Sequence, residues 1–131
     1  MYIFLYKGDP TKDIQDGSPV SQGDWTLPVE FPSLNIINAE ISPPVKLAIR
    51  CQAKTHTVGN TTITPYGPSA DKYRLSTDGL AWGAWGESLT IYSTITDVNT
   101  VFYAQARALA TEGPQKDNST SLRVNATLYG D

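Results

Sequence analysis

Cys51 and His56 carry nucleophilic and acid–base side chains, and each residue type occurs once in the 131-residue chain. A catalytic triad needs a nucleophile beside a histidine and a carboxylate. Cys51 and His56 are five residues apart, a spacing that strand alternation places on opposite faces. Cys51 also falls in the apolar row of its segment, which is typical of a small core residue. We therefore expect no catalytic pair, and one His with one Cys does not make a zinc site without several carboxylates.

The chain has 13 carboxylates, but they form no recognisable catalytic or metal-binding motif. A glycosidase needs two carboxylates facing each other in a cleft, and the sequence pairs none. Asp9, Asp13 and Asp16 share one segment without EF-hand spacing, so we expect solvated turn residues, with a loop Ca²⁺ site as the alternative. Gly83 and Gly86 are not followed by the Lys-Ser/Thr of a phosphate loop. We expect no catalytic residue, no metal ligand and no cofactor.

Trp82, Trp85 and Tyr92 are the strongest candidates for a ligand or interface contact. The two tryptophans are three residues apart, so in an unbroken strand they face opposite ways. An exposed tryptophan beside Tyr92 could stack on a sugar ring. The alternative is that both tryptophans pack inside the fold or in an oligomer interface, where each buries up to about 250 Å².

These residues lie among short segments, separated by Gly and Pro, several of which alternate between apolar and polar side chains. Residues 45–54 alternate between apolar and polar side chains, which predicts a half-buried strand. Asp78-Gly79 is a strong turn signal, and Gly59-Asn60 is a plausible turn. The other expected strands are Met1–Lys7, His56–Thr64, Lys72–Ser76, Leu80–Trp85, Glu87–Tyr92, Thr100–Ala110 and Ser119–Tyr129, with a short strand near Val29–Phe31 and either a helix or a strand at Leu34–Ile41.

This spacing predicts an all-β, antiparallel sandwich with no helix longer than about three turns. We expect one core to contain Leu47, Ile49, Phe102, Ala104, Leu122 and Val124. Residues 34–131 would form the sandwich domain. Residues 1–33, which are rich in Pro and Gly, would form an N-terminal strand and extended arm. The arm would contact a neighbouring subunit or fold back on its own domain as the first strand.

The stretch TVFYAQARA, from Thr100 to Ala108, resembles the sixth strand of fibronectin type III domains. That family places an aromatic residue two positions after the threonine and small or aliphatic residues at alternate positions. The aromatic residue is usually Tyr, whose hydroxyl bonds the backbone at the corner, whereas Phe102 stands here. The resemblance implies an immunoglobulin-like or fibronectin type III-like sandwich.

Most of the chain resembles small virion proteins of tailed bacteriophages and prophages. The resemblance rests on YKGDPTKDIQDGSPVS, KLAIRCQ, YRLSTDGLAWGAWGESLTI and VFYAQARALATEGPQKDNSTSLRVNATL. It implies a structural component of the tail, baseplate or decoration type, located in the virion. Other virion proteins would be its partners, and homo-oligomers are expected.

Charge and composition exclude several other classes of protein. The net charge is −3 and the basic residues are scattered, which disfavours nucleic-acid binding. No segment has the length and apolarity of a membrane span or the basic start of a secretory signal, so we expect synthesis in the bacterial cytoplasm. We therefore expect a non-enzymatic assembly protein. The alternative is a carbohydrate- or cell-surface-binding module that contacts a host surface glycan through Trp82, Trp85 and Tyr92.

Overall fold

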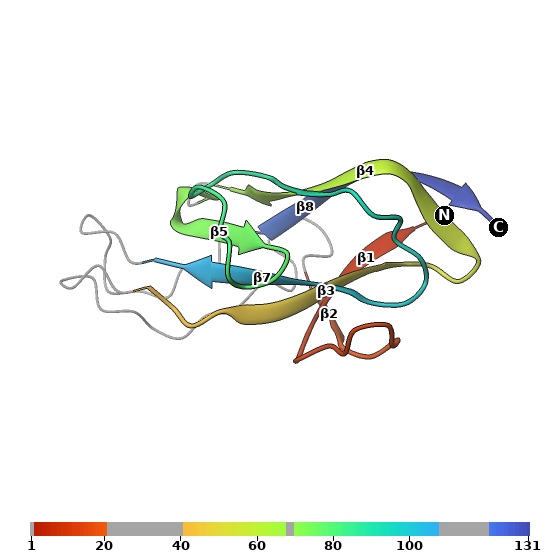
Figure 1. Cartoon of the computed structure of the whole chain (residues 1–131), viewed down its shortest axis with the longest axis horizontal. Helices are drawn as coiled ribbons and strands as arrows, with labels where there is room; N and C mark the ends of the chain where they lie inside the picture. Colours follow the sequence, from red (N-terminus) through yellow and green to blue (C-terminus); the bar gives the residue numbers. More distant parts are fainter. Residues whose placement is uncertain (1, 21–40, 68–69, 108–120) are drawn as a thin grey trace.

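The computed structural model describes residues 2–20, 41–67, 70–107 and 121–131. Over these residues two antiparallel sheets pack face to face, in the orders β2-β1-β3-β7-β5 and β6-β4-β8 (Figure 1). The expected antiparallel sandwich is therefore confirmed. The only helical element in the described part is the short 3₁₀ turn η1. The elements are β1 (Ile3–Lys7), β2 (Ser18–Val20), β3 (Val45–Cys51), β4 (Thr55–Tyr66), η1 (Ala70–Lys72), β5 (Tyr73–Ser76), β6 (Leu89–Ile91), β7 (Thr100–Ala106) and β8 (Ser121–Gly130).

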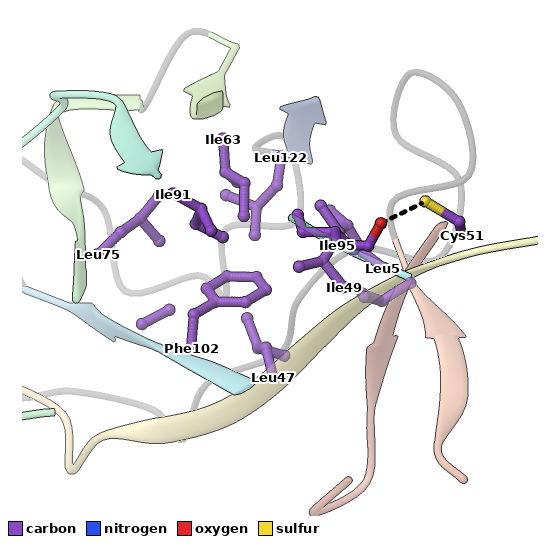
Figure 2. Close-up of a cluster of buried hydrophobic side chains, with 12 residues drawn as sticks. Leu5, Leu47, Ile49, Cys51, Ile63, Leu75, Ile91, Ile95, Phe102 and Leu122 are labelled. Atoms are coloured by element: carbon purple, nitrogen blue, oxygen red, sulfur yellow. Dashed lines mark hydrogen bonds between the residues drawn. The ribbon is translucent and has the colours of Figure 1, made fainter. Parts of the chain in front are cut away.

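The core lies between the two sheets and follows from strand alternation. Leu47 and Ile49 on β3 and Phe102 on β7 point inward from the larger sheet, and all three are fully buried. Figure 2 shows Phe102 directed toward Ile63 and Leu122 of the smaller sheet. The core predicted from alternation is confirmed, because five of its six members lie in one buried cluster and the sixth packs against it. These residues are Leu47, Ile49, Phe102, Ala104 and Leu122, with Val124 beside them.

The strand order does not by itself establish the immunoglobulin or fibronectin type. β7 pairs with β3 and β5, and β8 lies in the other sheet beside β4. In an immunoglobulin sandwich the sixth and seventh strands are neighbours in the same sheet. The shared feature is thus the two-layer antiparallel architecture.

The described part of the N-terminal segment belongs to the sandwich of its own chain. β1 lies between β2 and β3, with Leu5 opposite both Val20 and Ile49. Leu5 and Val20 are both buried in the core. The strand expected at Met1–Lys7 is present as β1, and residues 2–20 fold back on their own domain, because their apolar side chains complete the core. Residues 21–33 lie outside the described residues.

Two local predictions are also wrong. Gly59-Asn60 is not a turn, because β4 runs through it with a β-bulge between Val58 and Thr62. The expected strand at Leu80–Trp85 is an irregular segment, and only Leu89–Ile91 of the next expected strand is regular. The segments expected near Val29–Phe31 and at 34–40, and the end of the Thr100–Ala110 segment, lie outside the described residues. In the described part, no helix has the length and apolarity needed to cross a membrane.

Candidate functional site

β5 and β7 present polar side chains on the outer face of the larger sheet. Leu75 of β5 enters the core, so its neighbour Arg74 points outward, opposite Gln105 of β7. Arg74 donates from Nε and Nη2 to Gln105 Oε1, at 3.0 and 2.7 Å. Gln105 in turn donates from Nε2 to the carbonyl oxygen of Ser42 at 3.1 Å. These bonds fix the guanidinium group of Arg74 above the sheet.

The two tryptophans stack with arginines on this outer face. The Arg74 guanidinium lies 5.1 Å from the ring centroid of Trp82 and 4.5 Å from that of Trp85. The Arg107 guanidinium lies 4.6 Å from the ring of Trp85. Trp82, Arg74, Trp85 and Arg107 thus form an alternating series of rings and cations, which we call the tryptophan–arginine ladder. Each contact is a cation–π attraction between the guanidinium charge and the face of the ring.

The segment that carries the tryptophans runs along the outer edge of β5. Gly83 N donates to Leu75 O at 3.2 Å, and Gly86 N donates to Tyr73 O at 2.7 Å. Gly86 has a φ of +84°, and an added Cβ would lie 3.3 Å from the Cα of Asp71. Because this segment is not a regular strand, both tryptophans reach the same arginine. The unbroken strand that would place them on opposite faces is therefore not present.

A side-chain cap fixes the start of the segment. Asp78 Oδ1 accepts from the backbone nitrogens of Ala81 and Leu80, at 3.0 and 2.8 Å, and from Ser76 Oγ at 3.0 Å. These hydrogen bonds, led by that from Ala81, hold the pKa of Asp78 below its ordinary value. Gly79, with a φ of +76°, lies against the ring of Tyr103. The turn predicted at Asp78-Gly79 is thus present and is packed on β7.

Tyr92 does not belong to the ladder. It follows β6 in the smaller sheet, and 78% of its surface is exposed. Among the described residues, its ring contacts neither tryptophan ring. Trp82 and Trp85 are each partly buried. The three expected contact residues therefore divide into a packed pair and a separate exposed tyrosine.

Cys51 and His56 have separate partners on different strands. The Cys51 thiol donates to Ile95 O at 3.4 Å, and burial raises its pKa (Figure 2). His56 Nδ1 pairs with Asp131 Oδ1 near the chain end. The buried, protonated thiol is a core group, in accord with the sequence expectation.

A partly buried polar network, for which the sequence gives no signal, ties the β1–β2 loop to the larger sheet. Asn99, which is 1% exposed, donates to the carboxylate and the carbonyl of Asp16 and to the carbonyl of Thr11. Arg50 Nη1 donates to Asp16 O and to Asn99 Oδ1, at 2.7 and 2.8 Å. Asp16 is 83 positions from Asn99 and 34 from Arg50, so no local spacing signals the network. Asp16 is therefore a structural acid rather than a freely solvated one.

The described residues contain no group of three or more His, Cys, Asp or Glu side chains arranged to hold a metal ion. The functional groups that gather at the candidate site are arginine guanidinium groups, tryptophan rings and the side-chain amide of Gln105.

Comparison with known proteins yields no relative: no family model, no curated protein and no solved structure matches the chain.

Proposed function

We propose that this protein is a non-enzymatic structural component of a bacteriophage or prophage particle, of the tail, baseplate or decoration type, and that it acts through protein–protein assembly. The observation that supports assembly is the outer edge of β8. From Val124 to Gly130 this strand pairs with β4 on one side, and no other described strand pairs with it there. A long strand edge offers backbone N–H and C=O groups to a strand from another chain.

The other edges in the described part of the fold are short or covered. β2 and β6 have three residues each. The 83–86 segment covers β5 through its hydrogen bonds to Tyr73 and Leu75. Natural sheets protect edges by such covering when the edge is not used for association. The contrast singles out β8 as the edge suited to a partner.

The glycan-binding alternative has weaker support. Sugar stacking needs a free aromatic face, whereas two guanidinium groups lie over the Trp85 ring. Tyr92 is exposed, but it lies apart from the ladder. A single tyrosine gives little of the surface that a carbohydrate site requires.

The protein composition of purified particles tests this proposal. Particles released from the source strain would be purified on a density gradient, and their proteins would be quantified by mass spectrometry. We expect this protein at a fixed ratio to the major tail or capsid protein across independent preparations. Its absence from purified particles, with the protein present in the cell lysate, would refute the proposal.

A further inference from the structure

We propose that the β8 edge binds a second copy of this chain, with Val124–Gly130 of the two copies paired antiparallel about a two-fold axis. The pairing would join the two smaller sheets into one continuous sheet in which β8 of each copy is central. This inference rests on the proposed assembly function and names the partner of that edge.

The available edge is the second part of β8. Leu122 and Arg123, at the start of the strand, have interactions of their own. From Val124 to Gly130, the pairing found among the described strands is with β4 alone. Seven consecutive residues, the length of an ordinary strand, thus have an outer side on which no strand of the described ranges pairs.

This stretch lacks the features that discourage edge pairing. Val-Asn-Ala-Thr-Leu-Tyr-Gly contains no charged residue and no proline. The β-bulge of the β4–β8 pair lies on β4. Val58 and Thr62 are four positions apart, whereas their partners on β8, Thr127 and Asn125, are two positions apart. Lysine, proline and bulges are the usual protection of an exposed edge. Because the strand is uncharged, pairing it with itself brings no like charges together.

The alternation of β8 is compatible with such a pair. Asn125, Thr127 and Tyr129 are exposed, whereas the intervening Ala126 and Leu128 are partly buried on the core side. A two-fold axis at Thr127, the centre of the seven residues, sets Asn125 opposite Tyr129 of the second copy. Ala126 then lies opposite Leu128 of the second copy. Exposed side chains thus meet exposed ones, and core-side chains meet core-side ones.

Cysteine crosslinking of the full chain tests this pairing. The Thr127→Cys variant would be treated with a short bis-maleimide and analysed by denaturing electrophoresis. Thr94→Cys, which changes an exposed threonine outside β8, is the matched control. Cys51 is buried in both proteins. We expect a crosslinked dimer for Thr127→Cys at least tenfold more abundant than for Thr94→Cys, and equal yields would overturn the inference.

A second variant tests the same edge without a crosslinker. Asn125→Lys with Thr127→Lys places two cations on each copy of the paired edge, and Ser93→Lys with Thr94→Lys is the control of equal charge. Light scattering across a concentration series should show dimers for the native chain and the control but monomers for the β8 variant. A native chain that stays monomeric at high concentration would refute the inference.

The outcomes separate the two proposals. Presence in purified particles without β8 crosslinking would reject the self-pairing and leave the particle function standing. Crosslinking together with absence from particles would reject the particle function and keep the interface.

Discussion

At the residue scale, Trp85 should contribute more than Trp82 to the stability of the segment that carries both tryptophans, between β5 and β6. Trp85 contacts both Arg74 and Arg107, whereas Trp82 contacts Arg74. An exposed cation–π contact contributes about 0.5–1 kcal/mol. We expect Trp85→Ala to lower the free energy of unfolding by about 1–2 kcal/mol through these contacts, and Trp82→Ala by about half as much. Urea titration followed by circular dichroism measures both values.

Tyr92→Ala is the control for this comparison, because it removes an aromatic ring that is largely exposed. Its free energy of unfolding should stay within about 0.5 kcal/mol of the native value. If Tyr92→Ala and Trp85→Ala destabilised the fold equally, the ladder would have no special role. Glycan binding lost in a Trp85→Ala protein of unchanged stability would favour the carbohydrate hypothesis instead.

Asp16 gives the fold a predictable response to acid. Hydrogen bonds, first of all from the Thr11 hydroxyl, lower its pKa below the ordinary 3.8. A carboxyl whose pKa is lower in the folded state stabilises the fold above its unfolded pKa, and that stabilisation disappears as pH falls through the folded pKa. We expect Asp16→Asn to be less stable than the native chain at neutral pH. The difference should shrink as the pH falls below about 4.

Urea midpoints measured at intervals from pH 7 to pH 2.5 give this comparison. Asp9→Asn is the matched control, because the Asp9 side chain is 87% exposed and its contact with Lys46 is 3.5 Å long. An exposed pair of this kind contributes little. If the urea midpoints of Asp16→Asn and the native chain differed by the same amount at every pH, the carboxylate would not have the role given to it here.

At the element scale, regular alternation is what made strands predictable. β3, β7 and β8 each place apolar residues on one face at every second position. This pattern is local, so a half-buried strand can be predicted from it without knowing which distant strands will pair with it. Gly59-Asn60 fits a turn and a bulge equally well from the sequence, because glycine and asparagine favour left-handed backbone in both. The choice between the two depends on β8, which pairs on either side of the bulge.

The candidate site was only partly accessible from the sequence for a related reason. The sequence draws attention to Trp82, Trp85 and Tyr92 as aromatic residues, but the partners of the two tryptophans are set by tertiary structure. Arg74 lies on β5 and Arg107 directly follows β7, and nothing in their spacing relates them to the tryptophans. The two glycine N–H groups that bond the β5 edge are likewise defined only once β5 is in place. Local pattern therefore indicated the aromatic residues and not the ladder.

At the scale of the whole molecule, the two sheets share one core and should unfold together. Ile49 of the larger sheet and Leu122 of the smaller sheet both belong to the buried cluster, with 0% and 6% exposure (Figure 2). Removing a buried aliphatic side chain to alanine costs about 2–5 kcal/mol, because transfer energy is lost and a cavity is left. We expect Ile49→Ala and Leu122→Ala each to lower stability within that range. Both variants should retain a single unfolding transition.

Two spectroscopic signals test whether the sheets are coupled in this way. Far-UV circular dichroism follows the strands of both sheets. Tryptophan fluorescence follows the ladder on the larger sheet when both variants also carry Trp25→Phe, which removes the third tryptophan of the chain. Coincident transitions in both variants, with Val58→Ala close to native because Val58 lies on the surface, would match a single cooperative core. Two separated transitions would show that the sheets unfold independently. Losses below about 0.5 kcal/mol in both variants would instead mean that the inward and outward faces have been assigned the wrong way round.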